Sequence, residues 1–291
     1  MNLFAFGVGF SAEALIVEGR SCFAAVAGTA RSFERMAELA RHGIAARLFD
    51  GATFDPAIRE DLAKAEGVLV SIPPDAEGDP TLRGFGDALA AAPRLRWVGY
   101  LSTIGVYGDR GGAWVDETTP PAPSSERSRR RLAAEEAWLG WGRKCGKTVQ
   151  VFRLAGIYGP GRNALAHLAA GSARRIVKPG QVFNRVHVED IARALLAAMH
   201  APRPGAIYNV ADDEPAPPQD VVAYAAGLLG VEPPPEIPIH AAALGPMAAS
   251  FYAETKRASN RLVKEELGLA WRYPTYREGL RALFRAGEGR F

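Results

Sequence analysis

The sequence predicts an α/β fold in which a doubly wound parallel sheet is joined to a smaller C-terminal lobe. Short apolar runs alternate with helix-like segments over the first 155 residues, and a glycine-rich turn follows the first apolar run. Proline and glycine then become frequent after residue 156. Strands that alternate with helices are typical of a parallel sheet covered by helices on both faces.

The predicted elements follow one another in a regular order. Apolar runs predict strands at residues 3–7, 22–27, 44–49, 68–71, 95–102 and 149–154. Helix-like segments occupy residues 12–19, 32–41, 56–65 and 82–92, and a long one begins near residue 125. After residue 156 the dense breakers predict short elements joined by turns. A helix at 190–200 and a strand at 206–210 are expected to return to the first sheet.

This order predicts two domains. Residues 1–155 form a dinucleotide-binding type of domain, to which residues 187–212 return. Residues 156–186 and 213–291 form the smaller lobe, which we expect to bind a substrate.

Composition excludes several classes of protein. Of the 291 residues, 48% are hydrophobic and 23% are charged, which is typical of a globular protein, and the net charge of +3 is too small to predict a nucleic-acid partner. No uncharged apolar run approaches the roughly 18 residues of a membrane span, and the first residues do not resemble a signal peptide. Cys22 and Cys145 stand alone, and no His, Cys or Glu cluster has metal-ligand spacing. We therefore expect a cytoplasmic protein without a metal or a membrane partner.

The first predicted strand runs into the pattern G-x-G-x-x-A. Gly7 permits a tight turn, Gly9 lets the backbone approach a pyrophosphate, and Ala12 is small enough for close packing of helix against strand. The helix that starts at Phe10 and Ser11 offers N–H groups and a partial positive charge to phosphates. The alternative is a glycine turn without a ligand, but the strand–turn–helix context favours a bound dinucleotide.

The end of the second predicted strand indicates which dinucleotide. An NAD site usually has Asp or Glu there, about 20 residues after the first glycine. This chain has Gly28, followed by Thr29, Arg31 and Ser32, and an arginine fork with hydroxyls suits a 2′-phosphate. The residues therefore favour NADP over NAD, the alternative being a helix cap beside a solvated arginine. Asp50 ends the third strand, where it could bind the adenine amino group or hold a turn.

Further segments resemble the extended short-chain dehydrogenase/reductases, the family of NAD-dependent epimerases, dehydratases and related reductases. They are residues 100–108 (YLSTIGVYG), 153–161 (RLAGIYGPG), 186–192 (VHVEDIA) and 208–211 (YNVA). The resemblance covers nearly the whole chain and is closest to an atypical subgroup. It implies a Rossmann domain with a substrate lobe, and a possible homodimer through a two-helix contact.

The resemblance also implies roles for residues near the ends of two strands. Thr103 matches the family's catalytic Ser/Thr, which bonds the reacting oxygen of the substrate; the alternative is a strand-end hydroxyl bonded to local backbone. Ser102 then lines the nicotinamide pocket. Ser71, Ile72 and Pro73 follow the fourth strand, where the family lays its backbone along the cofactor.

The long helix departs from the family pattern. Glu135 matches a family glutamate, which places Arg131 at the lysine and Arg127 at the tyrosine of the family's Tyr-x-x-x-Lys pair. An arginine stays protonated, so Arg127 cannot exchange the proton that the tyrosine exchanges. Arg131 could still bind ribose hydroxyls; the alternative is that both arginines are exposed. No tyrosine between Gly108 and Gly156 can replace the missing one.

On the substrate side, the candidates are Arg162, Arg185 and His187, each of which could equally be a surface cation or a packed histidine. The resemblance implies an NADP-dependent oxidoreductase or isomerase of the epimerase type, with non-standard proton transfer. Its small-molecule substrate would be a nucleotide sugar or another polar hydroxyl or carbonyl compound. The alternative is a non-catalytic NADP-binding sensor or regulatory protein.

Overall fold

The main sheet of the computed structural model, which describes residues 1–289, has seven parallel strands in the order β11–β7–β5–β4–β1–β2–β3. The strands are β1 (Asn2–Phe6), β2 (Ala25–Ala30), β3 (Ala45–Leu48), β4 (Gly67–Val70), β5 (Trp97–Thr103), β7 (Val149–Leu154) and β11 (Ile207–Val210). This order confirms the predicted doubly wound parallel sheet. Only β2 is clearly displaced from its prediction, because Asn2 at the start of β1 pairs with Ala25 rather than with a residue near Cys22.

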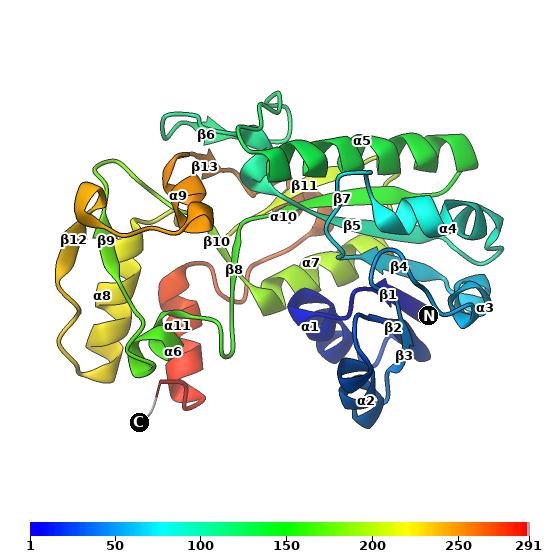
Figure 1. The fold of residues 1–291 in the computed structure, drawn as a ribbon, viewed down its shortest axis with the longest axis horizontal. Helices are drawn as coiled ribbons and strands as arrows, with labels where there is room; N and C mark the ends of the chain where they lie inside the picture. Colours follow the sequence, from blue (N-terminus) through cyan, green and yellow to red (C-terminus); the bar gives the residue numbers. More distant parts are fainter. Residues whose placement is uncertain (290–291) are drawn as a thin grey trace. The chain divides into compact units, whose positions relative to one another are not determined.

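Six helices accompany this sheet: α1 (Phe10–Glu18), α2 (Phe33–Arg41), α3 (Ala57–Lys64), α4 (Pro80–Ala91), α5 (Glu126–Cys145) and α7 (Val188–His200). Alternate residues of a strand point to opposite faces, and Phe4 and Phe6 of β1 join the core formed with α3, α4 and α5. On the other face α1 and α7 lie side by side, where a side chain added at Gly19 would meet Leu196 (Figure 1).

The chain divides into two units. Unit 1 contains residues 1–103, 126–153 and 191–208, and unit 2 contains residues 104–125, 154–190 and the described residues from 209 onward. Residues 104–125, which the sequence placed in the first domain, thus lie in unit 2. The reason is a long-range strand pair, since β6 (Trp114–Val115) pairs with β13 (Arg257–Ala258).

Unit 2 is assembled from short elements, as the proline and glycine clusters predict. Besides β6 and β13, it pairs β8 (Gly156–Tyr158) with β10 (Arg185–His187), and β9 (Arg175–Val177) with β12 (Glu236–Pro238). Its helices are α6 (Ala164–Ala169), α8 (Pro218–Leu229), α9 (Pro246–Tyr252), α10 (Arg261–Leu267), α11 (Tyr276–Arg285) and the 3-10 turns η1 (Ile104–Tyr107) and η2 (Ile239–Ala241). The helices α6, α8 and α11 enclose a small core around Leu165, Val221 and Leu280. Among residues 1–289, no helix is long and apolar enough to cross a membrane.

Candidate functional site

The strands β1 and β4 form the switch point of the sheet, because the chain continues from them toward opposite edges. Gly7 follows β1 and Ser71 follows β4. The Ser71 amide donates to the Phe6 carbonyl at 3.0 Å, and the Ser71 hydroxyl donates to the Gly7 carbonyl at 2.5 Å. Open α/β sheets bind ligands outside the carboxyl ends of their strands at such a point. Ile72 is half-buried and Pro73 exposed beside it.

The glycine turn has the geometry of a nucleotide cradle. Gly7 has φ +82°, and a Cβ there would lie 2.9 Å from Ile72 Cγ1, so only glycine fits. Gly9 directly precedes α1, and a Cβ built at Gly9 meets nothing within 4 Å. No side chain of the described residues caps this helix. The turn is therefore open at Gly9 and presents the N-terminus of α1, which fits a pyrophosphate.

The first turn of α1 packs tightly beneath this opening. Ala12 is 1% exposed and Ser11 is 7% exposed, whereas Phe10 is half-buried. A small residue is needed at position 12 because the helix approaches the sheet closely there.

The end of β2 lies further along the chain than predicted. Gly28 is inside the strand, where a Cβ would lie 2.6 Å from the Ala5 carbonyl oxygen, so the position excludes every side chain, acidic ones included. Thr29 is fully buried, and its hydroxyl accepts the Gly7 amide at 2.8 Å. Arg31 is the first exposed residue after the strand. Thr29 thus stabilises the glycine turn through its hydrogen bond with Gly7.

The start of α2 contributes a cation that the sequence did not identify. Ser32 caps α2 by accepting the Arg35 amide at 3.3 Å. The half-buried Arg35 side chain donates to the Val8 carbonyl of the glycine turn at 3.3 Å and forms ion pairs with Glu13 and Glu38. Arg35 could have been found from the sequence, because it lies three residues after Ser32, a residue type that often caps a helix.

Asp50 holds a turn. It is exposed, and its Oδ1 accepts the amides of Ala52 at 2.9 Å and Thr53 at 2.7 Å. These hydrogen bonds hold the pKa of the Asp50 carboxyl below its usual range.

The carboxyl end of β5 contains a buried ionic cluster, which we call the β5 cluster: Ser102, Glu135 and Arg153. Ser102 donates to Glu135, and Arg153 Nη2 lies 2.7 Å from Glu135 Oε2. Arg153 Nε also donates to both carboxylate oxygens, and both charged side chains are at most 4% exposed. Of these three, the sequence predicted a site role for Ser102 alone, while Glu135 served only as the match that places Arg127 and Arg131. Thr103, the last residue of β5, is half-buried.

Arg131 reaches the strand next to this cluster. Its Nη1 donates to the Leu101 carbonyl at 2.7 Å and to the Tyr100 hydroxyl at 3.2 Å. Burial raises the pKa of Tyr100 above its ordinary value, so that hydroxyl remains protonated. Arg131 is half-buried, whereas Arg127, four residues earlier on α5, is exposed. The two arginines at the Tyr-x-x-x-Lys positions thus differ in their surroundings.

Two of the predicted substrate residues in unit 2 have different environments. His187 is 1% exposed, its Nδ1 accepts the Glu189 amide at 3.2 Å, and burial lowers its pKa to about 4. It is therefore a neutral histidine packed against Tyr158 and Tyr273. Arg162 is exposed on a turn.

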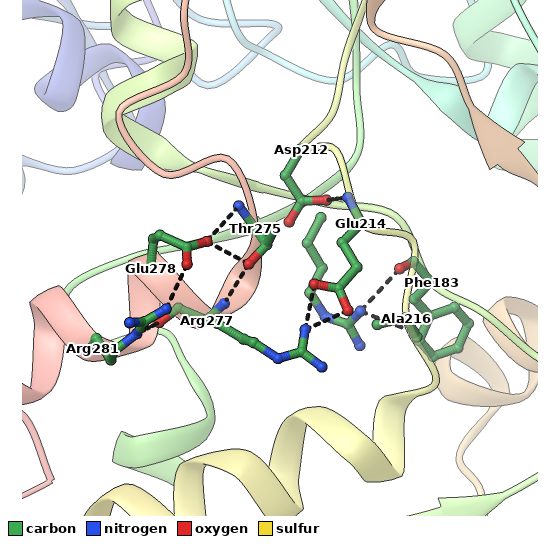
Figure 2. Close-up of polar contacts among 9 residues, drawn as sticks. Phe183, Asp212, Glu214, Ala216, Thr275, Arg277, Glu278 and Arg281 are labelled. Atoms are coloured by element: carbon green, nitrogen blue, oxygen red, sulfur yellow. Dashed lines mark hydrogen bonds and ion pairs between the residues drawn. The ribbon is translucent and has the colours of Figure 1, made fainter.

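The third, Arg185, is half-buried. Its Nη1 donates to the carbonyls of Phe183 at 2.9 Å and Ala216 at 3.1 Å. Figure 2 shows these two carbonyl residues in the same region as Asp212 and Glu214. No group of three or more His, Cys, Asp or Glu residues in the described part of the chain could hold a metal ion.

Comparison with known proteins agrees with this geometry. Residues 73–211 match the NAD dependent epimerase/dehydratase family. Protein YeeZ of Escherichia coli (strain K12) is 40% identical over 147 residues, which is 50% of each chain, so the match spans about half the length of that relative.

Two solved structures extend the likeness to the whole chain. A functionally unknown conserved protein from Silicibacter pomeroyi DSS is 47% identical over 99% of both chains, with a TM-score of 0.89. The UDP-glucuronic acid 4-epimerase from Bacillus cereus, solved in complex with NAD, covers 98% of this chain and 96% of its own with a TM-score of 0.79. At 16% identity, that likeness concerns the fold alone. Over residues 73–211 the present chain is thus similar to the NAD dependent epimerase/dehydratase family.

Proposed function

We propose that this protein is an NADP-dependent oxidoreductase or epimerase of an atypical subgroup that lacks the Tyr-x-x-x-Lys pair. Its substrate would be a nucleotide sugar or another polar hydroxyl or carbonyl compound. The observation that carries the proposal is the open turn at Gly9, at the switch point of the sheet and before an uncapped helix. A glycine turn serving only the fold would not need an unobstructed face toward solvent.

The preference for NADP rests on the residues after β2. Arg31 is exposed and has no hydrogen-bond partner among residues 1–289, and Ser32 and Arg35 stand within the next turn. A 2′-phosphate would meet guanidinium donors and a hydroxyl there. Residues 26–32 contain no Asp or Glu of the kind that usually binds the ribose hydroxyls of NAD. The Ala5 carbonyl also leaves no room for such a side chain at Gly28.

A bound nicotinamide would supply the hydride acceptor or donor, and the protein would position the substrate oxygen. Thr103 is our candidate for that hydrogen bond, since Ser102 already donates to Glu135. Arg131 steadies the strand through the Leu101 carbonyl and cannot act as a base. The proton would therefore come from the substrate itself or from water.

Titration of the protein with NADP and NAD tests the cofactor, and NADPH oxidation across a panel of nucleotide sugars and simpler carbonyl compounds tests the activity. We expect NADP to bind at least tenfold more tightly. Replacing Thr103 with Val should abolish turnover and leave NADP affinity unchanged, while Thr103→Ser should retain turnover. Equal affinity for both cofactors would remove the NADP assignment, and an active Thr103→Val would remove Thr103 from the mechanism.

One observation favours a second candidate, a non-catalytic NADP-binding sensor or regulatory protein. Arg127 stands at the position of the family's proton-transferring tyrosine, and α5 contains no tyrosine. Tight NADP binding without turnover across the whole panel would favour this candidate over the enzyme.

A further inference from the structure

We propose that Arg185, Asp212 and Tyr158 form a binding site for a carboxylate group with a neighbouring hydroxyl, which we call the carboxylate site. The proposal rests on the proposed function only in taking that carboxylate to belong to the substrate. All three residues lie in unit 2.

The guanidinium of Arg185 is only partly used by the protein. Its Nη1 donates to two backbone carbonyls, which fixes the side chain in place. Among residues 1–289, neither Nε nor Nη2 has a hydrogen-bond partner. Because Nε–H and one Nη2–H point in parallel, they form the fork that matches the two oxygens of a carboxylate.

Asp212 is the second incompletely bonded group. It is 3% exposed; Oδ1 accepts the Glu214 amide at 3.2 Å, while Oδ2 is buried with no partner in the described part of the chain. The Asp212 amide donates to the Arg185 carbonyl at 2.6 Å, so the two side chains leave adjacent backbone. Even so, no ion pair joins them. A buried oxygen without a hydrogen-bond partner is unfavourable, and a ligand group that bonds to it would remove that cost.

The other carboxylates of this region already have partners. Glu214 pairs with Arg277, and Glu278 pairs with Arg281 and accepts from Thr275 in a capping box (Figure 2). Their charges are therefore compensated and do not compete for Arg185. Of the described carboxyl groups labelled in Figure 2, Asp212 is the one that keeps an oxygen without a partner.

Three tyrosines lie near Arg185: Tyr158, Tyr252 and Tyr276. Burial raises the pKa values of Tyr158, Tyr252 and Tyr276, so all three hydroxyls are protonated at neutral pH. The Tyr158 hydroxyl is buried and has no partner among residues 1–289. It lies against α11, where a Cβ added at Gly279 would come within 2.0 Å of it. The site thus offers more donors than acceptors, which suits an anionic ligand.

Charge favours a carboxylate over a phosphate. Burial raises the pKa of Asp212 well above its ordinary value, so this carboxyl adds little negative charge. One guanidinium compensates a single negative charge, and a dianionic phosphate would leave a second one uncompensated in a poorly solvated site. Because Oδ1 accepts the Glu214 amide, the proton of this carboxyl lies on Oδ2, which would donate to the neighbouring hydroxyl oxygen of the ligand.

Isothermal calorimetry with three probes tests the site on protein without added nucleotide: D-glucuronate, D-glucose and D-glucose 6-phosphate. We expect saturable binding of glucuronate and at least tenfold weaker binding of the other two. Arg185→Lys keeps the charge without the fork and should weaken glucuronate binding at least tenfold, as should Asp212→Ala, which removes the carboxyl group. Arg261→Gln, at an exposed arginine of the same unit, is the matched control and should bind like the wild type.

Thermal melting and NADP titration of each variant show whether it is folded. Absent glucuronate binding, glucose binding of equal strength, tighter binding of glucose 6-phosphate, or a folded Arg185→Lys with unchanged affinity would each overturn the proposal. Glucuronate binding by a protein that does not bind NADP would support the carboxylate site while refuting the proposed function.

Discussion

Each unit places an arginine beside a buried carboxyl group, but the two arrangements differ. In unit 1, Arg153 and Glu135 of the β5 cluster are joined by three hydrogen bonds, one of them at 2.7 Å. In unit 2, Arg185 and Asp212 lie on adjacent backbone without forming an ion pair, and Asp212 keeps a buried oxygen without a partner. Buried charges that satisfy one another stabilise a specific geometry, whereas buried charges with unused bonds are suited to a ligand.

The largest effect is expected from breaking the satisfied pair. Glu135→Gln should lower the free energy of unfolding by about 3–5 kcal/mol, because it leaves Arg153 buried without a compensating charge. Urea denaturation followed by circular dichroism measures this loss. Glu278→Gln, which breaks an exposed pair with Arg281, is the control and should cost about 1 kcal/mol or less. A loss of similar size in both variants would contradict the assigned role of the β5 cluster.

The next effect concerns another buried titratable group of unit 2, His187. Its folded pKa of about 4 lies below the ordinary value of 6.5, so protonation of the unfolded chain lowers stability as pH falls from 6.5 toward 4. Between pH 7 and pH 5 the wild type should lose about 2 kcal/mol more than His187→Gln loses. Urea midpoints at the two pH values check the difference. The exposed His167→Gln should behave like the wild type, and a parallel loss in His187→Gln would show that another group is responsible.

A third test asks whether the glycine turn of unit 1 is built for a ligand. Gly9→Val places a side chain where nothing lies within 4 Å, so the fold should be retained. NADP affinity should nevertheless fall at least tenfold, or about 1.4 kcal/mol, because the side chain would occupy the path of the pyrophosphate. Gly84→Val, at an equally open glycine of α4, is the matched control for binding. Unchanged NADP affinity in Gly9→Val would show that the open turn at Gly9 does not bind the cofactor.

The smallest effect should be a gain in the free energy of unfolding rather than a loss. The folded pKa of Asp212 is raised, so the folded state holds a proton that the unfolded state releases, and this group lowers stability increasingly as pH rises above 3.8. Asp212→Asn should therefore be more stable than the wild type at pH 7, by about 1 kcal/mol, with a difference that shrinks toward pH 4. Urea denaturation at both pH values measures it. A destabilised Asp212→Asn would mean that the carboxylate is satisfied in solution.

Local patterns predicted much of the molecule. The alternation of apolar runs and helices predicted the doubly wound parallel sheet, and the glycine pattern located Gly7 and Gly9, because the residues involved are close in sequence. Sites formed by distant residues were not predictable in this way. Glu135 and Arg153 are 18 residues apart, and Asp212 meets Arg185 only after α7 has intervened. The end of β2 was misplaced because Gly28 and Thr29 interrupt the apolar run, although the register with β1 and β3 continues through them.

The pairing of β6 with β13 has a consequence for synthesis of the chain. Trp114 pairs with Arg257, which follows 143 positions later, while the last segment of unit 1 is complete by residue 208. A chain that leaves the ribosome from its N-terminus can therefore assemble unit 1 before residues 104–125 have their strand partner. Stalling translation between residues 208 and 257 would leave that segment without its strand partner and open to proteolysis.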